Sequence, residues 1–250
     1  MGAAFAWAFL GQSSLLVGAF VALGLRPSDR AVGLVMGFGS GVLISAVAYE
    51  LVEGAVTTSA GSGGVAIGLF CGSAVYFAGD LLLARRFGDE AMIDGLRRDE
   101  SSAPERGGTG LAIAMGATLD GIPESIVLGL TLVGAHGIGI AVLVAIFVSN
   151  LPEGIAATSE LRADGWSTRR ILTLWSTIVV VCAFAAALGY AVFADAAPHT
   201  VAFVDAFAGG AILTMLASTM MPQAFKNGGR LVGPLTTLGF IVAFALQGPS

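Results

Sequence analysis

Long apolar runs separated by short polar segments make up most of this chain. Eight runs are each about as long as the roughly 20 residues that a helix needs to cross the hydrocarbon of a bilayer. They cover residues 3–24, 31–53, 64–84, 109–133, 138–160, 169–193, 200–222 and 231–247. The one long connection, 85–108, mixes both charges with Ser, Pro and Gly, which predicts an aqueous loop. The pattern predicts an all-α membrane protein, a single domain over 1–250 with eight transmembrane helices.

The composition fits a chain surrounded by membrane lipid. Hydrophobic residues make up 56% of the sequence and charged residues only 12%, against roughly 25% charged residues in soluble domains. A chain this apolar is not expected to bind nucleic acid. Cys71 and Cys182 lie singly in apolar runs, so paired-thiol sites are not expected. Phosphate-binding loops and hydrolase motifs are absent from the sequence, so we expect neither an enzyme nor an organic cofactor.

The basic residues predict how the chain lies in the membrane. All 12 Lys and Arg residues fall in alternate connections, those after the first, third, fifth and seventh runs. Connections rich in Lys and Arg stay on the cytoplasmic side. We therefore expect 85–108 to be cytoplasmic and both termini to be extracytoplasmic. The small size and short loops favour a bacterial inner membrane as the location.

Two similar polar motifs interrupt the fourth and fifth apolar runs. They read DGIPES at 120–125 and SNLPEG at 149–154. Asp120 and Glu124 are four residues apart, so both face one side of a helix, and Ser149 and Glu153 share that spacing, with Asn150 beside them. Because consecutive spans run in opposite directions, we expect the two motifs to meet near the middle of the membrane.

Buried acids and prolines together are typical of a cation site. An ionised carboxylate at the bilayer centre costs about 2.5–3.5 kcal/mol, so three of them need protons or a cation. Pro123 and Pro152 have no N–H group, so the carbonyls of Leu119 and Val148 lose their helical partners and become available as oxygen ligands. These features predict proline-kinked helices 4 and 5 at the core, around a cation. The alternative is a pair of kinks whose protonated carboxylates bond across the helices.

At these motifs the sequence resembles the ZIP (Zrt-, Irt-like) family of divalent metal transporters. That family has eight spans with both termini outside, a His-Asn-x-Pro-Glu-Gly type motif in span 4 and a related motif in span 5. The segments 39–55 and 209–225 are alike in layout, as the corresponding spans 2 and 7 of the family are. The chain departs from the family where Asp120 replaces the usual histidine and Gly121 the neighbouring asparagine. Span 6 also lacks the glutamate of a second metal site, which favours one site.

The resemblance implies that the chain moves a divalent metal ion into the cytoplasm. Zinc comes first on family grounds. An all-oxygen site is harder than one with imidazole and would suit iron or manganese comparatively better, and cobalt and cadmium are also possible. A homodimer is also implied by the resemblance alone. The implied metal ligands, carried over by position, are Asp120, Glu124, Ser149, Asn150 and Glu153.

Four further acids lie toward the ends of the predicted spans. Glu50, Glu53 and Asp205 lie near the outer ends of spans 2 and 7 and are candidates for an entry path that attracts cations. They can equally be interfacial carboxylates that reach water. Asp80 lies near the inner end of span 3, where it can line the exit or only face water, and we expect it to face water.

A second function fits the same acids. In a proton-coupled carrier of a small solute, Glu124 and Glu153 would form the proton relay. Such a carrier would move protons with its substrate and need no metal.

Overall fold

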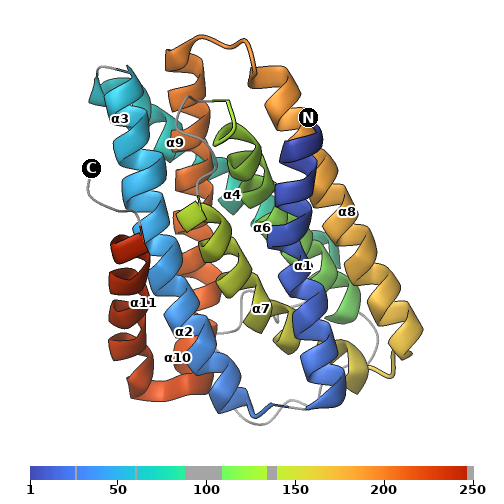
Figure 1. Ribbon diagram of the computed structural model, residues 1–250. Helices are drawn as coiled ribbons and strands as arrows, with labels where there is room; N and C mark the ends of the chain where they lie inside the picture. The colour runs from blue at the N-terminus through green and yellow to red at the C-terminus, as the bar shows by residue number, and fades with distance from the viewer. Residues whose placement is uncertain (26, 60, 88–108, 134–139, 247–250) are drawn as a thin grey trace.

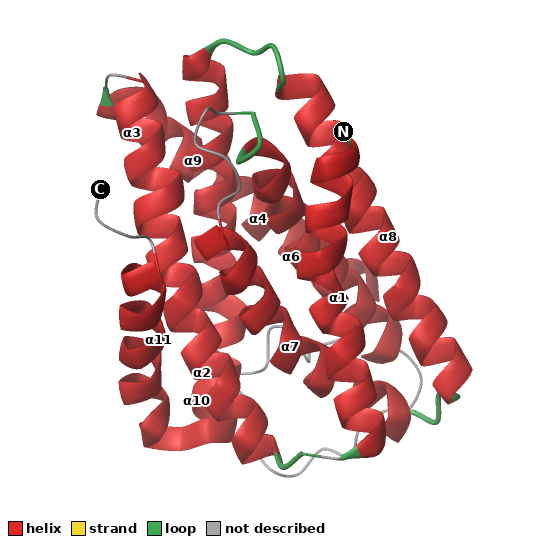
Figure 2. Ribbon diagram, in the orientation of Figure 1, coloured by secondary structure: helices red, strands yellow, loops and turns green. Residues whose placement is uncertain are grey.

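A computed structural model describes residues 1–250 except 26, 60, 88–108, 134–139 and 247–250. The described residues are helical, with no strand among them (Figure 2). Their helices are α1 Gly2–Gly24, α2 Asp29–Ala46, η1 Val47–Glu53, α3 Gly54–Ser59, α4 Ser62–Phe87, α6 Thr109–Leu130, α7 Ile140–Ala163, α8 Thr168–Phe193, α9 Pro198–Met215, η3 Leu216–Met220, α10 Met221–Gly228, η4 Gly229–Leu231 and α11 Val232–Leu246.

These helices group into rods that follow the predicted spans. The segments α2, η1 and α3 run on without a break, as do α9, η3 and α10, so the described residues form eight rods. Most rods begin and end within three residues of the prediction. The second rod continues to Ser59 and the seventh to Gly228, each beyond the predicted end. The predicted loop 85–108 lies outside the described residues except at 85–87, which end α4.

Six described stretches are long and apolar enough to cross a membrane, which makes this a multi-pass membrane protein by length and composition. They are Gly2–Gly24, Asp29–Ser59, Gly63–Leu83, Val142–Ala163, Thr168–Phe193 and Pro198–Leu246. The last stretch holds two rods, α9 to α10 and α11. The α6 rod, which carries the first Pro-Glu motif, is not among the six. Eight crossings therefore remain a prediction.

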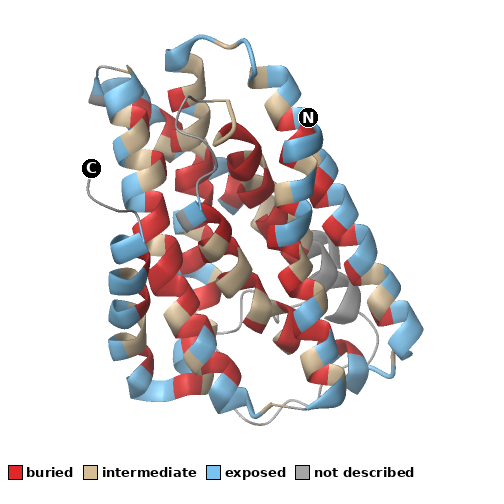
Figure 3. Cartoon of the chain, in the orientation of Figure 1, coloured by how far each residue is buried: buried red, intermediate tan, exposed pale blue. Residues whose placement is uncertain are grey.

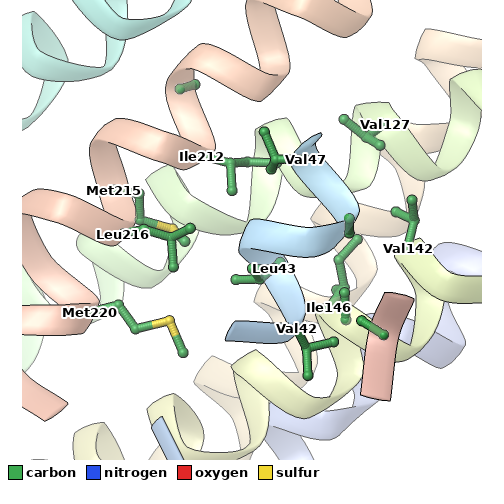
Figure 4. Close-up of a cluster of buried hydrophobic side chains, with 14 of the residues drawn as sticks. Val42, Leu43, Val47, Val127, Val142, Ile146, Ile212, Met215, Leu216 and Met220 are labelled. Carbon is green, nitrogen blue, oxygen red and sulfur yellow. The ribbon is translucent and has the colours of Figure 1, made fainter. Parts of the chain in front are cut away.

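The rods form a bundle with α7 inside it (Figure 1). The α7 helix packs against α1 on one side and α2 on the other, while α6 packs chiefly against α8. Buried residues concentrate where these rods face one another, and exposed ones lie on the outer faces of α8 and α11 (Figure 3). In the centre Val47, Val127, Ile146 and Ile212 bring four rods into one apolar cluster (Figure 4).

Glycines let neighbouring rods approach until their backbones touch. A Cβ atom at Gly41 of α2 would lie 1.8 Å from the carbonyl oxygen of Thr236 in α11. A Cβ at Gly72 of α4 would lie 1.7 Å from the carbonyl oxygen of Phe207 in α9. Such contacts are how helices pack in lipid, where no hydrophobic effect drives them together. The abundance of glycine in the sequence therefore serves packing.

The described connections separate into two ends of the bundle. Those joining α1 to α2, α7 to α8 and α10 to α11 lie at the lower end in Figure 1, whereas the N-terminus and the α8–α9 connection lie at the upper end. Arg30, Arg162 and Lys226 belong to the lower group. The side-by-side packing of the rods thus brings basic residues that are distant in sequence to one end.

Two π-helical turns, which the sequence did not predict, interrupt matching rods. The η1 turn lies in the second rod and η3 in the seventh, within the segments 39–55 and 209–225 that are alike in layout. A π-turn widens a helix locally and is frequent at functional sites. Glu50 is half-buried and Glu53 exposed in η1. The predicted entry-path acids of span 2 therefore lie on irregular helix.

Candidate functional site

The two Pro-Glu motifs lie on α6 and α7, and most of their polar side chains are buried. Asp120 is 9% exposed and Glu124 is fully buried, while Ser149 and Asn150 are buried on α7. Glu153 is half-buried. Glu153 lies within electrostatic range of both Asp120 and Glu124. The structure therefore brings the three predicted carboxylates into one neighbourhood.

Gln12 of α1 joins the two motifs through a single amide. Its Nε2 donates to Ser125 Oγ at 3.2 Å, to the Gly121 carbonyl at 3.4 Å and to Glu124 Oε2 at 3.5 Å. Its Oε1 accepts from Asn150 Nδ2 at 3.0 Å. One side chain from a third helix thus contacts both α6 and α7.

Glu124 keeps one oxygen without a partner. Its Oε2 accepts from Gln12, but its buried Oε1 has no hydrogen-bond partner in the described part of the chain. Leaving such an oxygen buried and unpaired costs about 1–3 kcal/mol, and more if it is charged. An orphaned carboxylate oxygen inside a membrane protein indicates a function that uses it.

Asp120 is engaged by a different helix. Tyr76 of α4, itself buried, donates from its hydroxyl to Asp120 Oδ1 at 2.5 Å. Asp80 follows one turn later on α4, is half-buried, and lies within electrostatic range of Asp120. The expectation that Asp80 faces water is met only in part, because its side chain is half covered. Asp120 of α6 and Asp80 of α4 are therefore near each other where these two helices meet.

The described residues do not form a ready-made metal site. No three His, Cys, Asp or Glu side chains among them are close enough together to hold a metal ion. Asp120 faces Tyr76, Glu124 faces Gln12, and Ser149 Oγ donates to the Ile146 carbonyl of its own helix at 3.1 Å. The five predicted ligands are neighbours, but several of their oxygens are hydrogen-bonded to other protein groups. Their carboxylates are not close enough together to hold a metal ion.

Both prolines lie inside helices that continue past them, Pro123 in α6 and Pro152 in α7. The Val148 carbonyl, freed by Pro152, faces Gly39 of α2, where a Cβ atom would lie 3.3 Å away. A Cβ at this distance would be tighter than most contacts of its kind, so Gly39 gives the carbonyl room beside the α2 backbone. The Val148 carbonyl is thus beside α2, in the interface with α7.

Asp205, the remaining candidate for the entry path, is half-buried on α9. Asp205, Glu50 and Glu53 make no hydrogen bond to the five predicted ligands within the described part of the chain. The structure therefore leaves these acids outside the hydrogen-bonded network at the motifs.

Gln12 and Tyr76 were missed by sequence reasoning. Each lies in a mostly apolar span that also carries a few other polar residues, and such a residue is typical of helix packing as well as of a site. The signal available was their rarity, since the first span carries one amide and the third span one phenol. Their contacts join residues 44 to 138 positions apart, which no local pattern predicts.

These features define a class: an all-helical, multi-pass membrane protein with buried carboxylates and amides gathered between α1, α4, α6 and α7. No protein-family model matches the chain. It is similar to an Arabidopsis thaliana protein named "Putative zinc transporter", with 27% identity over 198 residues. The match covers 78% of this chain but 30% of the Arabidopsis protein, so the chain spans less than a third of that relative's length.

Proposed function

We propose that this chain is a transporter that moves a divalent metal ion into the cytoplasm through a site between α6 and α7. The observation that carries the proposal is the buried, unpartnered Oε1 of Glu124, beside two further carboxylates in a bundle of apolar helices. A divalent cation would supply the partner that this oxygen lacks. The name of the Arabidopsis relative supports a metal ion, and zinc first, as the substrate.

The proposed ligands are Asp120, Glu124, Asn150 and Glu153, with Ser149 as an additional oxygen. All five offer oxygen and none offers nitrogen or sulfur as donor atom, which suits hard cations. Zinc is still proposed first because the Arabidopsis relative is named a zinc transporter, and iron, manganese, cobalt and cadmium are further substrates to test.

Binding would require the site to assemble. Tyr76 would have to release Asp120, and Glu153 would have to approach Glu124, because no three acids meet in the described structure. A cation that draws the two motifs together would shift α6 against α7, which is how a discontinuous helix pair exposes a midplane site to alternate sides. Release of the cation would return Asp120 to the Tyr76 hydroxyl.

The proposed orientation assigns an outer entrance and a cytoplasmic exit to the path of the cation. With eight crossings and the basic connections in the cytoplasm, the η1 and α9 acids would face outside. Glu50, Glu53 and Asp205 would then raise the local concentration of cations at the entrance. The cation would leave past Asp80 toward the cytoplasmic end of α4.

A proton-coupled carrier is the second candidate, and one observation favours it. The described acids do not form a three-ligand metal site, and neutral groups alone contact Asp120 and Glu124 by hydrogen bonds. Protonated carboxylates would tolerate that setting without a cation. Glu124 and Glu153 would then relay protons.

Metal uptake into proteoliposomes tests the proposal. We expect the purified chain to take up zinc, and the double variant Glu124→Gln/Glu153→Gln to lose at least about 90% of the rate, because two charged ligands are removed with little change in shape. Asp164→Asn, an exposed acid just beyond α7, is the matched control and should transport normally. Iron, manganese, cobalt and cadmium are tested in parallel.

Two results would count against metal transport. Uptake by the double variant at the wild-type rate would remove the site from α6 and α7. Absence of uptake of every metal by correctly inserted protein, together with solute-dependent acidification of the vesicles, would establish the proton-coupled carrier instead.

A further inference from the structure

Gln12 has the surroundings of a site residue and not those of a packing residue. It is fully buried, and its amide contacts Gly121, Glu124 and Ser125 of α6 and Asn150 of α7. The buried serine on the same helix, Ser14, donates only to the Gly11 carbonyl of α1. Of these two buried polar groups of α1, only Gln12 points between the Pro-Glu motifs.

The space that Gln12 occupies exists because residue 121 has no side chain. A Cβ atom at Gly121 would lie 2.9 Å from Cys182 Sγ and 3.4 Å from Gln12 Oε1. A Cβ here would be too close to Cys182 and already in contact with the Gln12 amide, so a side chain longer than that of alanine would reach the space that the amide occupies. The glycine in the first motif and the glutamine in the first span are therefore sterically linked.

The backbone of α1 is fixed to α7 close to the second motif. A Cβ at Gly154 would lie 2.5 Å from the Leu15 carbonyl oxygen, and a Cβ at Gly18 would lie 2.4 Å from the Leu151 carbonyl oxygen. These contacts lie within two turns of Gln12 on α1. We call these close backbone contacts between α1 and α7 the α1–α7 joint. They hold Gln12 beside α7, on the side that faces α6.

We propose that Gln12 is a ligand of the cation site, supplying a neutral amide oxygen from α1 beside Glu124 and Asn150. The inference rests on the proposed function. Without a cation, the Gln12 Nε2 group donates to Glu124 Oε2, and Glu124 Oε1 has no hydrogen-bond partner among the described residues. A cation at Glu124 repels the amide NH₂ group and attracts its oxygen. The two ends of an amide have nearly the same shape, so a half-turn about its last bond presents Oε1 to the cation. A matching half-turn of the Asn150 amide lets Asn150 Oδ1 accept from Gln12 Nε2, so the hydrogen bond between the two amides is kept with its direction reversed.

Metal titration of the purified full-length chain in detergent tests the role of Gln12, with zinc and manganese as the probes and calorimetry as the readout. Gln12→Met keeps the length of the side chain but has no amide, so zinc affinity should fall roughly 10- to 100-fold, the range seen when groups around a metal are lost. Gln12→Glu keeps an oxygen at the same place. It should retain zinc binding and improve manganese binding relative to zinc.

Two controls separate the role of Gln12 from folding and from the proposed function. Ser14→Ala removes a buried hydroxyl from the same helix and should bind zinc like the wild type. Glu124→Gln should lose zinc binding whatever Gln12 does. A cooperative melting transition, measured on every variant without metal, reports whether each remains folded.

The outcomes are distinct. Wild-type affinity in Gln12→Met, with binding lost in Glu124→Gln, would overturn the role of Gln12 and leave the proposed function standing. Gln12→Glu provides a second test, which remains available if Gln12→Met does not fold. If Gln12→Glu loses as much zinc binding as Glu124→Gln, the role of Gln12 is also overturned. A wild-type chain that binds neither metal would overturn the proposed function and the inference together.

Discussion

At the scale of single residues, the contact between Tyr76 and Asp120 would compete with a cation at the proposed site. The phenol donates to the carboxylate at 2.5 Å, and hydrogen bonds to charged groups are worth about 1.5–3 kcal/mol. Removing the hydroxyl in Tyr76→Phe leaves Asp120 unpaired until a metal binds. We expect zinc affinity to rise by about tenfold, the change that roughly 1.4 kcal/mol produces, measured by calorimetric titration.

The same substitution should separate two roles for Tyr76. Tyr190→Phe on α8 is the matched control, since Tyr190 makes no hydrogen bond to the motif residues within the described part of the chain, and its zinc affinity should stay at the wild-type value. Unchanged affinity in Tyr76→Phe would mean that Asp120 is not a ligand. Weaker affinity would mean that the phenol supports the bound state.

The part of the site that could be predicted consists of residues close together in the sequence. Asp120 and Glu124 could be predicted as neighbours, because a spacing of four puts both on one helix face. Gln12 and Tyr76 could not, because each reaches the motifs from a helix whose rotation is set by packing. The contacts between glycines and neighbouring backbones fix that rotation, and their partners are invisible in sequence.

At the scale of helices, the joint between α1 and α7 should control the site. An alanine at Gly154 would place its Cβ 2.5 Å from the Leu15 carbonyl oxygen, so the helices must separate. Overpacking of this kind costs about 1–3 kcal/mol. We expect Gly154→Ala to lower the melting temperature by several degrees and to reduce uptake, because Gln12 moves away from Asn150.

A glycine without neighbours provides the comparison for this joint. A Cβ at Gly64 of α4 would meet nothing within 4 Å, so Gly64→Ala should leave uptake unchanged and stability equal or slightly higher. Equal melting temperatures and uptake rates in the two alanine variants would contradict the role given to the joint.

The π-turns mark where element prediction from sequence fails. The apolar pattern predicts a helix through 47–53 and 216–220 but does not distinguish α from π geometry. For η3 a local cause can be given, since Pro222 lacks an N–H group and frees the Ser218 carbonyl. No proline follows η1 at this distance, so no local cause of this kind explains its geometry, and η1 packs against α9, which is distant in sequence.

At the scale of the whole molecule, the run lengths were enough to predict the rods. Hydrocarbon thickness sets a similar length for every span. The eight apolar runs therefore predicted eight helices, and the ends of most of them lie close to the ends of the observed rods. The longer second and seventh rods escaped prediction because they continue through more polar residues, in α3 and α10. Which end of the bundle faces the cytoplasm depends on charge and not on packing.

That orientation can be tested by labelling single cysteines in intact cells with a maleimide that does not cross membranes. In a background where Cys71 and Cys182 are replaced by alanine, Asp195→Cys lies in the α8–α9 connection and Asp164→Cys in the α7–α8 connection, both at exposed positions. Because Arg162, Arg169 and Arg170 flank Asp164 and no basic residue lies near Asp195, we expect immediate labelling at 195. Labelling at 164 should require permeabilised cells. The reverse pattern would place both termini in the cytoplasm, and the carboxylates of η1 would then face the exit and not the entrance of the proposed path.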